Sequence, residues 1–484
     1  MNPVLRYSTA VLLLALPVTL EAQHISLKTV PIPLGEQFSI FPSRNLGMGS
    51  VRVAHDDAQL DPFTNPARIS MAPDLRVFAL PTFYGEANSM LGGRTFPIAV
   101  VVPGKRIFGS AAFAMQQVDT PRRFRWGPPI VQEGSVFGEE GGSNVYVQGS
   151  VGARLSKRTA LGASVYHADL DGVDAVNLLY GNSIAIDQSG SVGDVRVGLL
   201  HDFGAERRLD AVVLRSSVDM RHDVLYQDWT WTPTGPTDVR TWTELNEDRT
   251  ITWGAHLRYR QPLNTTGAYL GLIATGSTKA HPKIPNYNIV NIPRDPGNST
   301  AFNFGVGLSN ITSDGEFSME LVYEPGRSHT WAYADTAIAA PAGTIQPGGK
   351  TVDNQFRYGN WNLAVGVARE GERGGFQLGL RMHQTRFSLD QHNYLTSTRR
   401  RTDERWLEWA PSWGGVLKFK GFDLRYTGRA TMKGWPSVTF LGGRAEMAVS
   451  APDIDYVVGP TGPVQLQEYR VTMHRFMVSV PFGR

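Results

Sequence analysis

The chain contains no cysteine among its 484 residues. This absence excludes a disulfide scaffold, thiolate metal sites, cysteine catalysis and a lipoprotein anchor. An excess of charge of one sign is missing too, because 47 basic and 44 acidic residues leave a net charge of only +3. The strong basic bias of a nucleic-acid binder is therefore absent, and we expect no nucleic acid among the partners. We also expect no cofactor and no metal.

Long apolar runs are lacking beyond the N-terminus, so no transmembrane helix is expected in the mature chain. Near the N-terminus, Arg6 precedes an apolar run from Ala10 to Leu20, and Ala22 is a small residue suited to cleavage. This pattern predicts a secretory signal peptide over residues 1–22, with the mature chain starting near Gln23. A membrane-spanning helix is the alternative, but the run is far shorter than the roughly 20 residues a span needs. An exported chain without such helices can cross a membrane only as a closed barrel.

Glycine is abundant, with 51 residues against roughly 34 at the average usage of about 7%. Apolar residues recur with a period of two along most of the chain, which is the strand signal. In residues 361–368, for example, Trp361, Leu363, Val365 and Val367 alternate with small or polar residues. Successive side chains of a strand point to opposite faces, so each segment has one apolar face. The chain is therefore expected to be all-β.

Sixteen such segments can be counted, and the connections between them alternate between short and long. The segments lie near 75–83, 93–102, 106–117, 143–155, 159–169, 190–203, 208–219, 249–260, 267–278, 300–310, 315–325, 355–369, 375–388, 405–419, 421–432 and 470–482. The long connections are 118–142, 170–189, 220–248, 279–299, 326–354, 389–404 and 433–469. A soluble sandwich does not sort its loops in this way, whereas an outer-membrane barrel has short periplasmic turns opposite long external loops. We therefore predict a transmembrane antiparallel β-barrel of 14–16 strands over residues 74–484, in the outer membrane of a Gram-negative-type bacterium.

Aromatic residues support a membrane barrel. Trp406, Trp409 and Trp413 cluster near the loop end of one segment, and Trp229, Trp231 and Trp242 fall in or beside a long connection. Indole rings favour the membrane–water interface, although packing within a loop is the plainer alternative for the second trio. The last segment ends on Phe482, with Pro481 before it and Gly483 and Arg484 after it. This end resembles the signal by which the barrel assembly machinery receives outer-membrane proteins.

The segment before the first strand carries an ordered set of motifs. Residues 44–49 read Arg-Asn-Leu-Gly-Met-Gly, residues 51–58 contain His55, Asp56, Asp57 and Ala58, and residues 63–68 read Phe-Thr-Asn-Pro-Ala-Arg. This order resembles the start of the FadL/TodX family of outer-membrane transporters for hydrophobic compounds, and of PorV-like relatives in type IX protein secretion. The resemblance implies that residues 23–73 form a hatch, or plug, inside the barrel. It places these residues in the hatch: Gly47, Met48, Gly49, Asp56, Asp57, Asn65, Pro66 and Ala67.

Two features depart from the family pattern. Arg68 stands where the family commonly has glycine, and the family barrel has fourteen strands where we count sixteen. The resemblance implies passive uptake of hydrophobic small molecules, such as long-chain fatty acids or aromatic hydrocarbons. A PorV-like component of protein secretion remains an alternative, and a barrel enzyme is a further one. No motif matches the family's substrate pocket, so no pocket residue is transferred.

Polar side chains on the predicted inner face form the second group of candidate residues. They include Arg196, His256, Arg258, Arg260, Glu320, Glu324, Arg381, His383, Asp423 and Arg425. A charge network that ties the wall to the hatch is one interpretation, because buried charges need partners. The other is that some of these residues line a permeation path or bind a carboxylate. The basic clusters Arg122, Arg123 and Arg125, and Arg399 to Arg401, fall in predicted external loops, where they could contact outer-membrane lipids and lipopolysaccharide.

Catalytic motifs are not evident in the sequence. Adjacent residues of a strand point to opposite faces, so His55, Asp56 and Asp57 are not expected to converge on a substrate or a metal ion. There is no His-Glu-x-x-His pair and no Gly-x-Ser-x-Gly elbow. We therefore expect a channel with a hydrophobic small-molecule ligand and no enzymatic activity.

Overall fold

The computed structural model describes residues 37–86, 92–119, 142–173, 183–232, 235–281, 297–313, 315–334, 336–433 and 470–482. The predicted signal peptide lies outside the described residues, as do Arg122, Arg123 and Arg125 and nearly all of the expected loops 118–142, 279–299 and 433–469. Within the described residues, no helix is long and apolar enough to cross a membrane.

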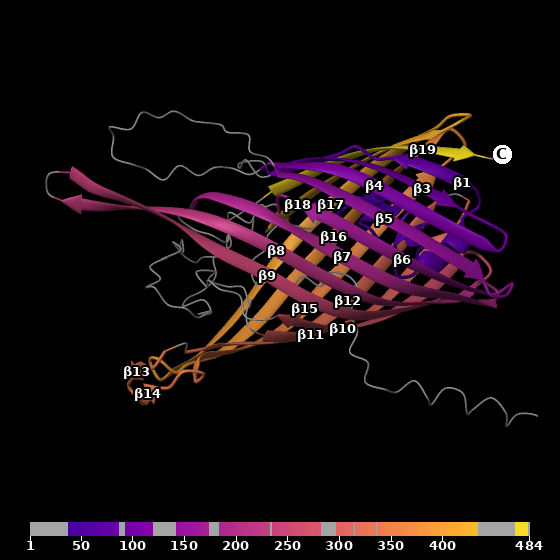
Figure 1. The fold of residues 1–484 in the computed structure, drawn as a ribbon. Helices are drawn as coiled ribbons and strands as arrows, with labels where there is room; N and C mark the ends of the chain where they lie inside the picture. The colour runs from indigo at the N-terminus through magenta and orange to yellow at the C-terminus, as the bar shows by residue number, and fades with distance from the viewer. Residues whose placement is uncertain are drawn as a thin grey trace, which may run out of the picture.

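One large antiparallel sheet closes on itself to form a barrel (Figure 1). Its strands are β1 (Leu75–Ala79), β2 (Thr82–Glu86), β3 (Gly92–Val102), β4 (Ile107–Asp119), β5 (Gly142–Arg154), β6 (Thr159–Leu170), β7 (Ser183–Gly204), β8 (Arg207–Thr232), β9 (Gly235–Pro262), β10 (Ala268–His281), β11 (Gly297–Ile311), β12 (Glu316–Tyr333), β15 (Lys350–Glu370), β16 (Gly374–Asn393), β17 (Thr398–Lys418), β18 (Asp423–Lys433) and β19 (Arg470–Phe482). A small separate hairpin, β13 (Ile338–Ala340) with β14 (Gly343–Ile345), lies between β12 and β15.

Strands β1 and β2 share one position in the barrel, because each of them pairs with both β3 and β19. The break between them falls at Leu80 and Pro81, and proline has no N–H to donate to a sheet. The neighbouring strands still bind the break, since Leu80 N donates to Pro97 O at 2.9 Å and Phe476 N donates to Pro81 O at 3.0 Å. Counted in this way, the described strands occupy sixteen positions, which confirms the predicted barrel and the count of sixteen.

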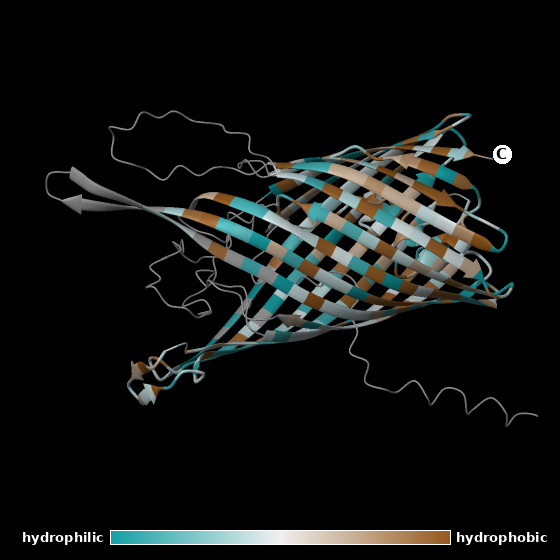
Figure 2. Cartoon of the chain, viewed as in Figure 1, coloured by the Kyte–Doolittle hydropathy of each residue, from teal (hydrophilic) through white to brown (hydrophobic). Residues whose placement is uncertain are grey.

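The outer face of the barrel is apolar. On β11, Phe302, Phe304, Val306 and Leu308 are 42–53% exposed, whereas the intervening Asn303 is buried. Figure 2 shows the same alternation of hydrophobic and hydrophilic residues along neighbouring strands. Large apolar side chains arranged around the outside, with polar ones within, invert the pattern of a soluble protein and suit a surface that faces lipid.

The short connections are tight turns at one end of the barrel, as expected. Between β7 and β8, for example, the turn residues Ala205 and Glu206 have positive φ angles of 50° and 59°, which is the backbone of a type I′ hairpin turn.

Two of the predicted long loops are wrong, because the strands continue through them. Residues 220–248 extend β8 and β9 as a paired hairpin that projects beyond the barrel in Figure 1. Residues 389–404 extend β16 and β17 as a second hairpin, which places Arg399 to Arg401 in a strand. Polar residues interrupt the alternation in both segments and concealed these strands, because backbone pairing above a membrane needs no apolar face.

Candidate functional site

The described N-terminal segment (residues 37–73, "the N-terminal segment" below) packs against the inner wall of the barrel. It contains the short helices η1 (Asn45–Met48), α1 (Asp61–Thr64) and η2 (Pro66–Met71). Asn65 is the N-cap of η2, since its side-chain oxygen accepts a hydrogen bond from Ala67 N at 3.0 Å. Pro66 occupies the first helical position, where no N–H is required. Gly49 ends η1 with a φ of 71°, a backbone conformation that glycine adopts without strain.

Three pairs of wall glycines receive this segment. In each pair the two glycines face each other across neighbouring strands, and a Cβ on either would collide with the segment. Met48 and Gly49 sit on Gly366 and Gly379, Val53 and Ala54 on Gly271 and Gly307, and Asn65 and Pro66 on Gly162 and Gly198. The predicted hatch motifs are therefore the parts of the segment that approach the wall backbone most closely. Six of the 51 glycines thus serve to let the segment approach the wall.

Asp57 holds together the two ends of the loop between η1 and α1. Its carboxylate accepts hydrogen bonds from Ser43 Oγ at 2.6 Å and from the backbone N–H groups of Arg44, Asn45, Gln59 and Leu60 at 3.0–3.1 Å. With every oxygen used in this way, Asp57 shapes the backbone of the segment and has no capacity left for a ligand.

Arg68 is the hub of a buried charge cluster. Its guanidinium lies 2.7 Å from Asp56, 2.5 Å from Asp61 and 3.0 Å from Asp210 of β8. Asp56 in turn contacts three wall arginines at 2.7–3.1 Å, namely Arg208, Arg258 and Arg260. Arg68 and Asp56 therefore both join the segment to the wall.

Burial and the arginines shift the pKa values of Asp56 and Asp61 in opposite directions. Burial would raise the pKa of Asp56, but Arg68, Arg258 and Arg260 outweigh it and hold that pKa well below the usual value. Burial dominates at Asp61 and raises its pKa to about 6, against the opposing effect of Arg68 and Arg258. Asp56 is thus the firmly charged member of the cluster, and Asp61 is the member that can gain a proton near neutral pH.

Wall side chains also bind the backbone of the segment. Arg258 Nε donates to Val53 O at 3.1 Å, and Arg260 Nε donates to Ala54 O at 2.9 Å. Glu320 of β12 accepts from the N–H groups of Arg52 and Val53 at 2.7 and 2.8 Å. These hydrogen bonds lie beside the Gly271 and Gly307 pair, so the same stretch of the segment is held both by charged side chains and by close backbone packing.

A second charge network lies closer to the short turns. Arg44 reaches Glu316 at 2.6 Å and Glu370 at 3.4 Å. Glu370 also binds Arg425 at 2.8 Å and Lys418 at 3.3 Å. This network joins η1 to four strands, β12, β15, β17 and β18.

The other predicted inner-face residues contact the wall more than the segment. Arg196 binds Asp194 at 2.6 Å and also Thr64 O at 3.4 Å, and Arg381 binds Ser50 O at 3.4 Å. His383 lies between two carboxylates, with Glu408 at 3.3 Å and Glu324 at 3.6 Å. His256 contacts Thr275 at 2.8 Å, and Asp423 lies 3.9 Å from Arg76.

His55, Asp56 and Asp57 point to different partners. His55 Nδ1 lies 2.9 Å from Ser318 Oγ, whereas the two aspartates bind the arginine cluster and the loop backbone respectively. In the part of the chain that the structure describes, no three histidine or acidic side chains are grouped closely enough to hold a metal ion.

Sequence reasoning missed several partners, chiefly Asp210, Glu316, Glu370 and Arg208. Strand alternation could have found Asp210, because it precedes the inward-facing Val212 and Leu214 by a period of two. The sequence carries no signal that pairs Arg44 with Glu316 and Glu370, since 272 and 326 residues separate them.

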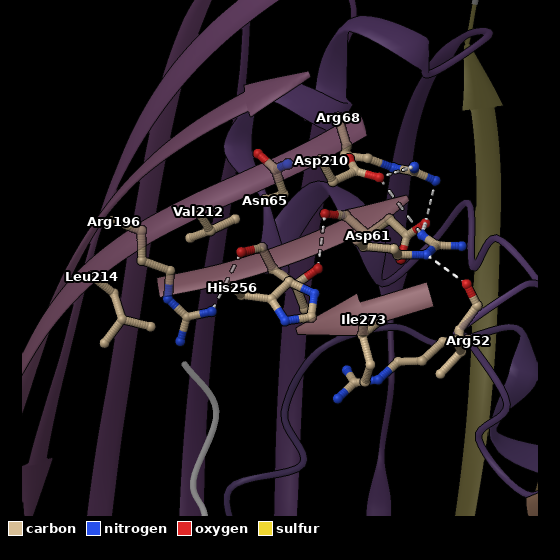
Figure 3. A pocket seen from close by; sticks show the side chains of 13 residues that line it. Arg52, Asp61, Asn65, Arg68, Arg196, Asp210, Val212, Leu214, His256 and Ile273 are labelled. Carbon is tan, nitrogen blue, oxygen red and sulfur yellow. Dashed lines mark hydrogen bonds and ion pairs between the residues drawn. The ribbon is translucent and has the colours of Figure 1, made fainter. Parts of the chain in front are cut away.

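A small cavity lies beside the Arg68 cluster (Figure 3). Its volume is about 60 Å³, enough for a few water molecules. Its lining combines polar side chains, among them Arg196, His256 and Arg258, with the apolar side chains of Val212, Leu214 and Ile273. The cavity is thus amphipathic and lies where the segment, β7, β8, β9 and β10 meet.

An apolar stripe leads from this cavity along the inner face of β8. Every second residue faces inward, and most of these are apolar, namely Val212, Leu214, Val218, Met220, Val224 and Tyr226. Aromatic and apolar residues of β5, β6 and β7 widen the stripe with Tyr146, Tyr166, Ala168, Leu170 and Val192. The inner wall therefore has one apolar side, unlike the charged wall formed by β12 and β15 to β18.

The start of the N-terminal segment covers this stripe. Phe38 meets the ring of Tyr146 edge-on at 6.3 Å, and Phe41 stacks on Phe63 at 5.2 Å. Ile40 is buried in the same cluster. Hydrogen bonds hold residues 37–41 in place. Gln37 Nε2 donates to Gly172 O, and Arg475 donates to the carbonyls of Ser39 and Phe41. The stripe is thus occupied by the protein's own aromatic side chains.

Comparisons with known proteins find similar outer-membrane barrels among solved structures but do not assign the chain to a family. No protein-family model matches the chain, and no curated protein matches it. Among solved structures, the toluene transporter TbuX of Ralstonia pickettii aligns at a TM-score of 0.40 and 10% identity, over 92% of this chain and 100% of that one. The toluene transporter TodX of Pseudomonas putida gives 0.38 and 11%, over 90% and 96%. The open form of the ferric-catecholate receptor Fiu of E. coli K12 gives 0.39 and 9%, over 84% and 82%. Likeness at these scores does not assign the chain to a family.

Proposed function

We propose that the protein is an outer-membrane channel for the passive uptake of hydrophobic small molecules, in which the N-terminal segment serves as the plug. The observation that carries the proposal is the apolar stripe along the inner face of β8, which ends at the amphipathic cavity. A water-filled pore has no use for such an apolar stripe, because a polar lumen is the norm for such barrels.

The outer surface supports the location. Large apolar side chains alternate around the described barrel, and short turns gather at one end while long hairpins extend from the other. Export by a signal peptide and insertion by the barrel assembly machinery would bring the chain to this membrane, with the short turns in the periplasm.

The proposed path begins among the long hairpins. An incoming ligand meets Tyr226 and Val224 first, follows β8 inward and displaces Phe38 and Phe41 from the stripe. Its apolar body takes over contacts that the phenyl rings make in the resting state, so the exchange conserves buried apolar area. At the cavity, the Arg196 guanidinium suits a carboxylate head group that takes over part of its contact with Asp194, which favours a long-chain fatty acid over an uncharged hydrocarbon. Release to the periplasm follows a shift of the N-terminal segment.

Uptake into proteoliposomes tests the proposal. The stripe variant Leu214→Asn with Val218→Asn puts amides in the apolar lane, and we expect it to lower uptake of a fluorescent long-chain fatty acid at least fivefold. The matched control is Thr427→Asn, which adds the same amide to the buried inner face of β18, outside the stripe. Equal uptake by the stripe variant and the control would refute the proposed lane.

A second arm addresses the ligand class. An uncharged aromatic hydrocarbon is offered in place of the fatty acid, and Arg196→Gln is compared with wild type. We expect Arg196→Gln to impair fatty-acid uptake more than hydrocarbon uptake. If Arg196→Gln lowered fatty-acid uptake and hydrocarbon uptake to the same degree, carboxylate binding would be refuted, whereas the apolar stripe as a path would still stand.

A further inference from the structure

Four outward-facing arginines form a continuous line across four neighbouring strands. They are Arg327 of β12, Arg357 of β15, Arg386 of β16 and Arg405 of β17, and all are exposed. We call them the arginine row. The row lies on the outside of the barrel and is separate from the lumen and the plug.

The arginines are brought together in like-charged pairs by strand register. Arg327 is directly opposite Arg357, and Arg386 is directly opposite Arg405. Arg357 is opposite Ser388, which makes Arg386 its diagonal neighbour on β16. Directly opposed side chains have Cβ atoms about 4.5–5.5 Å apart, and like charges at that distance repel each other.

The described acidic side chains do not neutralise the charge of the arginine row. Among the described residues, no ion pair joins any of the four arginines to an acidic side chain. The acidic residues on the same outer face have other partners: Asp353 binds Lys350 at 2.5 Å and His329 at 3.0 Å, and Asp403 binds Arg401 at 3.1 Å. Asp390 lies opposite Arg401 in the register.

The four arginines lie at the same level along their strands, measured from the apolar part of the outer face. On each strand the arginine lies four residues closer to the long hairpins than a large apolar or aromatic side chain on the same face. The pairs are Tyr323 and Arg327, Trp361 and Arg357, Met382 and Arg386, and Trp409 and Arg405. Tyr323 and Trp361 are directly opposite and their rings lie 4.6 Å apart. Below these residues the outer face is apolar, with Met319, Leu321, Leu378 and Leu380 exposed by 37–53%.

This order of apolar band, aromatic ring and cation is the order of acyl chain, interface and head group in a membrane. Four residues of strand span about 13 Å before tilt, which carries the guanidinium groups from the aromatic level into the head-group layer. Guanidinium binds phosphate through paired hydrogen bonds, and a closely spaced row can share doubly charged phosphates between neighbours.

We propose that the arginine row is a docking site for the phosphate groups of lipid A in the outer leaflet of the outer membrane. The bound phosphates supply the negative charge that the described acidic side chains do not place there, and they bridge the two pairs of arginines that otherwise repel each other. The lipopolysaccharide contacts predicted at Arg399 to Arg401 stay a prediction, separate from the arginine row. Arg400 faces inward and donates to Gln391 Oε1 at 2.8 Å, and Arg401 is paired with Asp403.

Native mass spectrometry of the detergent-solubilised full chain tests this proposal. We expect wild type to bind diphosphoryl lipid A at least tenfold more tightly than its dephosphorylated form, and more tightly than phosphatidylglycerol. The variant with all four row arginines changed to Gln should lose this preference. The control variant, Arg221→Gln with Arg249→Gln and Arg401→Gln, removes exposed arginines that already have acidic partners and should keep it.

Folding is checked by the heat-dependent mobility of the barrel in electrophoresis. If the fourfold variant does not fold, Arg327→Gln with Arg357→Gln, and Arg386→Gln with Arg405→Gln, replace it, and each pair should weaken lipid A binding at least threefold. Equal binding of lipid A with and without phosphate would overturn the proposal. So would binding of phosphatidylglycerol as tight as that of lipid A, or equal losses in the row and control variants.

Discussion

Replacing Gly379 with alanine should dislodge the N-terminal segment without harming the barrel. A Cβ at this position would lie 2.0 Å from Gly49 N and 2.3 Å from Met48 C, whereas ordinary van der Waals contact begins at 3.4 Å. Both colliding atoms belong to backbone, so no side chain can rotate out of the way. The segment must therefore move by more than an ångström, and overpacking of this kind costs about 1–3 kcal/mol.

The cost falls on docking of the segment, because the strand itself tolerates alanine. Gly366 lies opposite Gly379 and would meet Met48 O at 2.3 Å if it carried a Cβ. The double variant Gly366→Ala with Gly379→Ala should therefore roughly double the loss, to about 2–6 kcal/mol if the two effects add.

Two assays read the displacement of the segment. Limited proteolysis of the protein in detergent should cleave the N-terminal segment faster in Gly379→Ala than in wild type, and planar bilayers should show a higher ion conductance. Gly149→Ala is the matched control, since a Cβ at Gly149 meets nothing within 4 Å. The reasoning is refuted if Gly379→Ala and Gly149→Ala cannot be distinguished while both barrels are folded.

Three further predictions concern the charge cluster and the cap. Arg68→Met removes the shortest ion pairs of the buried Asp61 and Asp210 and leaves them only Arg258, at 3.5 and 4.0 Å, so it should weaken docking by up to about 3–5 kcal/mol, measured as the denaturant concentration at which protease cleaves the segment. Burial raises the pKa of Asp61 to about 6, above the usual 3.8; docking should therefore strengthen as the pH falls from 7 to 4, and Asp61→Asn should abolish that slope in the same assay across pH. Asn65→Ala removes the acceptor for Ala67 N and the bond to Asp210 at a cost of about 1 kcal/mol or more, and it should change uptake of hydrophobic substrates; unaltered uptake of every substrate tested would count against a plug role.

The barrel could be read from the sequence because its physics is local and periodic. Apolar residues at every second position of β11, such as Phe302 and Phe304, mark an outward face without reference to any other strand. Short turns likewise follow from local chemistry, as between β7 and β8. Alternation did not reveal the outer parts of β8, β9, β16 and β17, where polar residues interrupt the period although the backbone pairing continues.

The candidate site was less predictable, since it depends on pairs that are distant in sequence. The inward direction of Arg258 and Arg260 follows from alternation, but their partner Asp56 lies more than 200 residues away. Arg68 stood out only because it departs from the glycine of the resembling family. Its role became clear from Asp210, whose opposite charge no local pattern relates to it.

The three glycine pairs also constrain the order in which the chain folds. The first is made by β6 and β7, the second by β10 and β11, and the third by β15 and β16, so the seats for the N-terminal segment are completed one after another as the sheet grows. The segment is the first of the described parts to leave the ribosome, yet its last seat exists only when β16 has paired. Contacts of such long sequence separation form slowly, because a large loop must close before they contribute. Docking of the segment is therefore expected to be a late, slow phase of folding, and a nearly finished barrel would pass through a stage in which its lumen is open.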